Sequence, residues 1–151
     1  MEIFKRSYSY RFLQRLRNAQ PRAVGIERIK GWIDEGGHVK SFEAVKEMDE
    51  RCKHAGVDFV VVILPGFLDV VPSITSMSDY PFTEQHALII KELESAGIRV
   101  FDLVADFGDR NPNELIAHPR DRHFNAEGCS IVAAAIEKRL LPSLPSYAAK
   151  N

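Results

Sequence analysis

Apolar and polar positions repeat with a helical period over much of the first third of the chain. Residues 10–17 place apolar side chains on one side and arginines on the other, which predicts an amphipathic helix ending before Pro21. Residues 23–33 form a weaker helix candidate. A third helix is predicted from Ser41, a favourable N-cap residue, to Gly56.

The period changes at residue 58. Residues 58–65 form an uninterrupted apolar, β-branched run that closes at Pro65-Gly66, which predicts a strand buried on both faces and is typical of a central parallel strand. Residues 98–104 predict a second strand. The two are linked by a predicted helix over 82–96, with Gly97 as the residue that ends it.

Two polar loops and a last helix complete the pattern. Residues 66–81 leave the carboxyl end of the first predicted strand, and long loops at this position in parallel sheets are often functional. Residues 106–122 form the second loop. Asn125 is then expected to cap a helix that Pro142 stops, and residues 142–151 are expected to be a frayed tail.

This order of helices and strands is typical of an α/β fold with right-handed crossovers. Only two convincing strands are present, whereas an average sheet has about five or six. We therefore expect a three-layer α/β/α, flavodoxin-like domain that is incomplete in this chain. The chain is either the later part of a larger α/β domain, which we prefer, or takes strands from a partner, and its open sheet edge would permit self-association.

Composition narrows the class of protein. With 151 residues, 45% of them hydrophobic, the chain suffices for one domain with a core but is short for two. The net charge is −1, but the charge is unevenly distributed. Residues 1–30 form a basic region with eight lysines and arginines and two acidic residues, Glu2 and Glu27. Such a region suits nucleic acid or anionic lipid. Without aromatic–basic interleaving, we favour a cationic helix face that docks on acidic surface elsewhere in the same or a longer protein, and expect no nucleic-acid partner.

The remaining bulk features point to a soluble chain. Cys52 and Cys129 form no CxxC pair, so we expect no disulfide scaffold and no zinc site, and both are expected to be packing residues in helices. The N-terminus turns polar within a few residues and lacks the apolar core of a secretory signal. No apolar run approaches the ~18 residues that a membrane span requires. By default we expect a cytoplasmic location.

The candidate chemistry lies where Asp121 precedes His123 by two residues. Side chains two apart in extended backbone point the same way, so the carboxylate can accept the imidazole Nδ1–H. Nε2 is then left to take a proton from a hydroxyl. The helix expected at Asn125 disfavours the imidazolium and the aspartate favours it, and a base near neutral pH needs that balance.

Two other interpretations of this loop stay open. The pair is either a surface feature without a role, or part of a metal site made by His118, Asp121 and His123. The rigid Pro119 and the absence of helical i, i+4 spacing make the second a poor match to zinc proteases.

Three stretches resemble the C-terminal half of an SGNH (GDSL-type) hydrolase. Residues 59–64 resemble the penultimate core strand of that family, and 97–103, Gly-Ile-Arg-Val-Phe-Asp-Leu, resemble its last strand. Residues 121–128, Asp-Arg-His-Phe-Asn-Ala-Glu-Gly, resemble its final Asp-x-His-x-Asn-x-x-Gly block. On this resemblance residues 1–141 form the C-terminal part of an SGNH-like domain.

The resemblance implies an ester or acyl hydrolase in which Asp121 and His123 are the acid and base of a Ser-His-Asp triad. It implies a small-molecule ester or acylated carbohydrate as substrate, and no metal or organic cofactor. Trp32, Phe67 and Leu68 are candidates to line the substrate pocket, although for Trp32 a packing role is favoured.

The chain departs from the family in lacking a nucleophile. It has neither a Gly-Asp-Ser block nor a Gly-x-Asn-Asp block, so the attacking serine and the oxyanion donors are missing. Phe124 stands where proline or tryptophan is common, and Cys129 where a second histidine is frequent. No serine of the chain is expected at a strand-to-helix elbow, whether in the helix lead-in or in the long loop (Ser7, Ser9, Ser73, Ser76 and Ser78).

Three functional hypotheses follow. The preferred one is the C-terminal portion of an SGNH-type serine esterase or acyl hydrolase. The second is a catalytically inactive SGNH-like module that binds a partner through its basic region. The third, a flavodoxin-like ligand-binding domain, ranks last because no phosphate-cradling glycine loop follows a strand.

Overall fold

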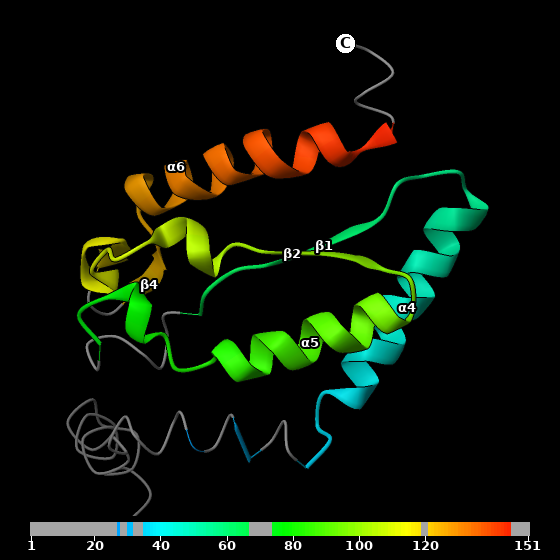
Figure 1. Ribbon diagram of the computed structural model, residues 1–151, viewed down its shortest axis with the longest axis horizontal. Coiled ribbons are helices and arrows are strands. Elements are labelled where there is room, and N and C mark those ends of the chain that lie inside the picture. Colours follow the sequence, from blue (N-terminus) through cyan, green and yellow to red (C-terminus); the bar gives the residue numbers. More distant parts are fainter. Residues whose placement is uncertain (1–26, 28–29, 32–34, 67–73, 119–120, 146–151) are drawn as a thin grey trace, which may run out of the picture.

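The computed structural model describes residues 27, 30–31, 35–66, 74–118 and 121–145. Its helices and strands follow the order α4 (Val39–His54), β1 (Val60–Ile63), α5 (Thr83–Ser95), β2 (Arg99–Asp102), β3 (Ile116–His118), β4 (Asp121–Phe124) and α6 (Ala126–Ala135) (Figure 1). Short 3₁₀ turns cover Met77–Asp79, Val104–Phe107 and Pro112–Glu114. The last helix continues as a π-helical turn, Ile136–Leu140, and a 3₁₀ turn, Leu141–Ser143.

The two predicted strands pair in parallel. Val60 lies opposite Arg99 and Ile63 opposite Asp102, and α5 connects the two strands. In Figure 1, α6 and α5 lie on opposite sides of this pair. The expectation of an α/β protein is therefore confirmed.

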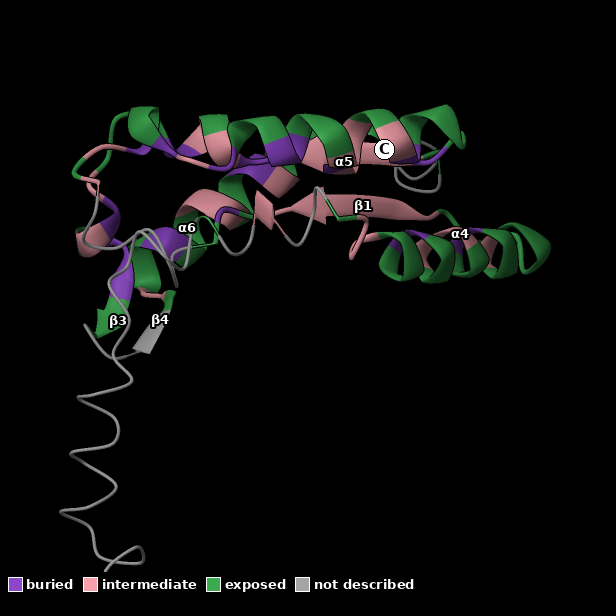
Figure 2. Ribbon diagram, turned by 90° about the horizontal axis from the view of Figure 1, so that it is seen from below, coloured by how far each residue is buried: buried purple, intermediate pink, exposed green. Residues whose placement is uncertain are grey.

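Alternate residues of the strands face two hydrophobic clusters, as side chains on a strand must. Val61 and Val100 pack against a cluster in which Phe42 of α4, Leu93 of α5 and Ile98, the residue before β2, are buried. Val62 and Phe101 pack against the larger cluster, which includes α6 and the 3₁₀ turns (buried Met77, Tyr80, Phe82, Leu103, Phe107, Leu115, Ile116 and Ala135). Because both faces are covered, β1 carries no alternating polar residues. Figure 2 shows α5 exposed on its outer side and buried toward the strands.

Helix α4 begins earlier than the sequence predicts. Its N-cap residue is His38, whose side chain makes no capping hydrogen bond, and Ser41 lies inside the helix. The glycine turn explains the difference: Gly36 has a positive φ of 78°, and its carbonyl oxygen accepts the Val39 N–H at 3.1 Å. Helix α5 ends as predicted, with Gly97 at φ 78°.

The polar stretch 106–122 is not a simple loop, which corrects the prediction. It contains β3 and the start of β4, an antiparallel pair with Ile116 opposite Phe124, His118 opposite Asp121, and one register shift between them. The described residues thus hold four strands in two two-stranded sheets rather than two strands in one. Strands of three or four residues rich in polar side chains leave no periodic signal to read.

The cysteines behave differently from one another. Cys52 is half-buried in α4, in line with a packing role, whereas Cys129 is exposed in α6, which contradicts the expectation that it packs. No helix in the described ranges is long and apolar enough to cross a membrane. Several predictions fall on residues outside the described ranges: the helices over 10–17 and most of 23–33, the basic region, and Ser7, Ser9, Trp32, Phe67, Leu68 and Ser73.

Candidate functional site

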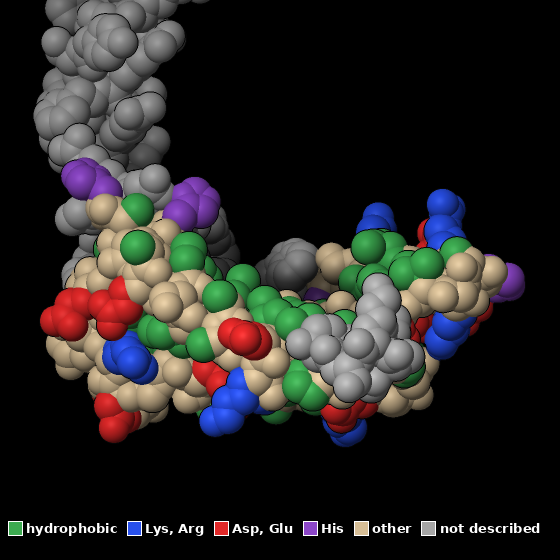
Figure 3. All heavy atoms as spheres, turned by 90° about the horizontal axis from the view of Figure 1, so that it is seen from above, with side chains coloured by type: hydrophobic (Ala, Val, Ile, Leu, Met, Phe, Trp, Pro, Cys, Tyr) green, Lys and Arg blue, Asp and Glu red, His purple; other side chains and the backbone are tan. Residues whose placement is uncertain are grey.

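Strand β4 carries both residues of the predicted acid–base pair. Asp121 and His123 lie two apart in it, and the strand ends directly before Asn125. His123 is exposed, and Figure 3 shows histidine side chains on the surface at the hairpin end of the molecule. The side chain of Asp121 is outside the described part of the chain, so its contact with the His123 imidazole stays a prediction.

Asn125 fixes the junction between β4 and α6, as predicted. Its Oδ1 accepts the Gly128 N–H at 3.0 Å, and its Nδ2 donates to the Glu114 carbonyl oxygen at 2.6 Å. Its backbone N–H donates to the Leu115 carbonyl oxygen at 2.9 Å. One side chain therefore caps the helix and holds it against the turn that precedes β3.

Gly128 is required at this junction by close packing. A Cβ at this position would lie 3.0 Å from the Leu115 carbonyl oxygen and 3.1 Å from the Phe124 Cβ. Phe124 in turn stacks on Phe107, with ring centroids 5.5 Å apart. The asparagine and glycine of the Asp-x-His-x-Asn-x-x-Gly block thus have structural reasons for being where they are.

The metal interpretation gains no support from the described residues. His118 is exposed and its Cα pairs with that of Asp121 across the hairpin. Within the described ranges, no group of three or more histidine, cysteine, aspartate or glutamate residues could hold a metal ion.

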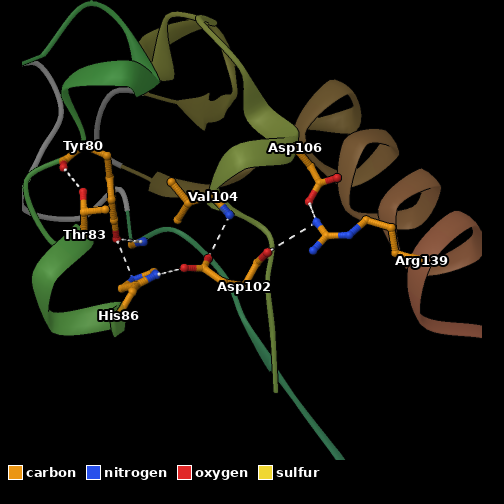
Figure 4. A network of polar contacts seen from close by, with 8 residues as sticks. Tyr80, Thr83, His86, Asp102, Val104, Asp106 and Arg139 are labelled. Atoms are coloured by element: carbon orange, nitrogen blue, oxygen red, sulfur yellow. Dashed lines mark hydrogen bonds and ion pairs between the residues drawn. The ribbon is translucent and has the colours of Figure 1, made fainter. Parts of the chain in front are cut away.

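A second histidine–aspartate pair, which the sequence analysis missed, lies inside the protein. His86 of α5 is 7% exposed, and its Nδ1 is 3.0 Å from Oδ2 of Asp102, the last residue of β2 (Figure 4). The other carboxylate oxygen, Oδ1, accepts the Val104 N–H at 2.9 Å. No sequence motif predicts this pair, because His86 and Asp102 lie 16 residues apart and come together only in the folded protein.

Tyr80 extends the pair into a chain of polar contacts. Its hydroxyl lies 3.4 Å from His86 Nε2 and accepts the Gly66 N–H at 2.9 Å. The tyrosine ring meets the rings of Phe82 and His86 edge to face. Burial raises the pKa of Tyr80 to about 12, so the phenol keeps its proton at neutral pH and can donate it in a hydrogen bond.

Contacts of Arg139 connect the last helix to the edge of β2 that faces away from β1. The Arg139 guanidinium pairs with the Asp106 carboxylate and also donates to the Asp102 carbonyl oxygen at 3.4 Å (Figure 4). Arg139 belongs to the π-helical extension of α6. The end of the last helix is thereby tied to the carboxyl end of β2.

Comparisons with known proteins return no relative: no protein-family model, no curated protein and no solved structure matches this sequence.

Proposed function

We propose that this chain is the acid–base portion of an SGNH-type serine esterase or acyl hydrolase with a flavodoxin-like fold. The observation that carries the proposal is the course of the backbone through β4, where Asp121 and His123 lie two apart in one strand that runs straight into the capped start of α6. A parallel strand pair with helices on both faces is consistent with it.

In the proposed reaction His123 is the general base. Its Nε2 accepts the proton of a serine hydroxyl as the serine oxygen attacks the ester carbonyl carbon. The imidazolium then returns the proton to the leaving alcohol, and water repeats the sequence to release the acid. Asp121 accepts the Nδ1–H and stabilises the imidazolium while it exists. Small esters and acylated carbohydrates are the proposed substrates.

The outer edge of β1 is the proposed docking position for the strands that bring the serine. The Leu103 N–H donates to the Ile63 carbonyl oxygen, so the backbone polar groups of Ile63 point toward β2. Backbone groups of successive residues in a strand point to opposite edges, so those of Val60 and Val62 point away from β2. No described residue pairs with that edge. The outer edge of the pair on the β2 side differs, because the Asp102 carbonyl oxygen there already accepts a hydrogen bond from Arg139.

The first test uses the chain alone. We expect it neither to hydrolyse p-nitrophenyl acetate faster than free imidazole does nor to react with a fluorophosphonate, since the sequence predicts no serine at a strand-to-helix elbow. Fluorophosphonate labelling of the chain alone would contradict the statement that the nucleophile comes from elsewhere.

The second test uses the natural reading frame that contains this chain, together with whatever precedes it. We expect His123→Ala to lower kcat/KM for an ester on the order of 10⁴-fold, because a triad fails without its base. His118→Ala, which removes an exposed histidine from the neighbouring strand, is the matched control and should change kcat/KM less than about twofold. Unchanged activity in His123→Ala would overturn the proposal. An inactive natural protein that captures a partner would favour the binding-module hypothesis instead.

A further inference from the structure

The buried contacts of Tyr80, His86 and Asp102 join segments that end at the same place in the fold. Asp102 is the last residue of β2, and Gly66, which donates to the Tyr80 hydroxyl, follows the end of β1 by three residues. His86 lies in the first half of α5, between them. The carboxyl ends of the two parallel strands are therefore linked through side chains as well as through the sheet.

Each group in this chain of contacts has one consistent hydrogen-bonding role. A carboxylate only accepts, so the Asp102 contact requires a hydrogen on His86 Nδ1, which donates the hydrogen bond. In the neutral imidazole this hydrogen defines the Nδ1–H tautomer and leaves Nε2 as an acceptor, which suits the phenol proton of Tyr80. The phenol oxygen keeps lone pairs for the Gly66 N–H. Tyr80 and His86 are 6% and 7% exposed, so water competes little for these positions.

We propose that Asp102, His86 and Tyr80 form a positioning relay for the end of β1: Asp102 selects the imidazole tautomer, the imidazole orients the phenol, and the phenol oxygen fixes the Gly66 amide. We assign the three a positioning role, because Tyr80 and His86 are buried and both carboxylate oxygens of Asp102 are held by groups of the protein itself. Ligands of parallel α/β sheets bind beyond the carboxyl ends of the strands, so the relay sets the backbone where such a ligand would sit. It goes beyond the proposed esterase function and holds whether or not His123 is a base.

The tautomer provides the first test. Long-range ¹H–¹⁵N correlation spectra of the ¹⁵N-labelled chain are expected to show the Nδ1–H pattern for His86. In Asp102→Asn the amide oxygen is retained by the Val104 N–H, so the amide NH₂ faces the imidazole and Nδ1 must become an acceptor. We expect His86 to switch to the Nε2–H tautomer. An Nε2–H pattern in the wild-type protein, or no switch in a folded Asp102→Asn variant, would overturn the proposal.

The Gly66 amide provides the second test. Tyr80→Phe keeps the buried ring and removes the hydroxyl, so hydrogen exchange at Gly66 should become about three- to tenfold faster. Thr83→Val is the matched control, because it removes a different hydrogen bond to Tyr80, from the Thr83 hydroxyl to the Tyr80 carbonyl oxygen. It should leave both Gly66 exchange and the His86 tautomer unchanged.

A reference amide separates this local effect from a general loss of stability. The Cys129 N–H, bonded to the Asn125 carbonyl oxygen in α6, should keep its exchange rate in Tyr80→Phe. Equal acceleration at Gly66 and Cys129, or none at Gly66, would contradict the relay. If Asp102→Asn fails to fold, the wild-type tautomer and Tyr80→Phe still decide the question.

Discussion

At the scale of single residues, the contrast between two histidines is the main finding. His86 is buried with both ring nitrogens in contact with partners, whereas His123 is exposed on a short strand. The role of His123 could be proposed from the sequence, whereas the contacts of His86 could not. A histidine next to an aspartate in a strand forms a local pattern, but a histidine on a helix face gains an aspartate partner only when the strand beside it is in place.

The raised pKa of Tyr80 makes stability depend on pH in the alkaline range. Its folded-state pKa of about 12 lies above the ordinary value of 10, so the folded protein holds the phenol proton more tightly than the unfolded chain does. The resulting stabilisation is complete below pH 10 and is lost as pH rises from 10 toward 12. We expect urea unfolding to show this decline, and Tyr80→Phe to lack that part of it. An identical decline in Tyr80→Phe would contradict the assignment.

At the scale of elements, the parallel pair could be predicted and the hairpin could not. Strand β1 consists only of β-branched apolar residues and packs on both faces, which leaves a continuous apolar run in the sequence. Strand β2 contributes Val100 and Phe101, one to each hydrophobic cluster. Strands β3 and β4 are short, and their pairing depends on a bulge and on contacts with α6 that no local pattern encodes. The start of α4 was misplaced for a related reason, since a glycine turn rather than a capping side chain begins that helix.

The packing of the hairpin against α6 predicts the effect of adding a single methyl group. Gly128→Ala places a Cβ 3.0 Å from the Leu115 carbonyl oxygen, a backbone atom that cannot move without shifting the turn. We expect a loss of about 1–3 kcal/mol in the free energy of unfolding, measured by urea denaturation. Cys129→Ala, at the neighbouring exposed position, is the control and should change stability by less than about 0.5 kcal/mol. A neutral Gly128→Ala would mean that the helix and the turn are less closely packed than described.

At the scale of the whole molecule, the edge of β1 that no described strand pairs with is the feature that bears on assembly. Such an edge with apolar residues nearby favours strand pairing with another chain. Leu64, just beyond β1, is 42% exposed. We expect the isolated chain to self-associate in a concentration-dependent way, as measured by light scattering after size-exclusion chromatography.

A charge at this edge should suppress that association. Leu64→Lys places a charge at the end of β1 and should shift the chain toward the monomer. Leu88→Lys is the matched control, since Leu88 is 36% exposed on α5 and away from the strand edge. If both variants associate as the wild type does, the edge is not the surface involved.

The two sheets also differ in how much polypeptide separates their paired strands. The paired residues His118 and Asp121 lie close together in the sequence. The paired residues Val60 and Arg99 lie far apart in it. Contacts between distant segments carry a larger loop-closure cost and form later during folding. On a ribosome, α4 and β1 would therefore emerge with their apolar sides uncovered until β2 has been synthesised, a period in which a chaperone could bind them first.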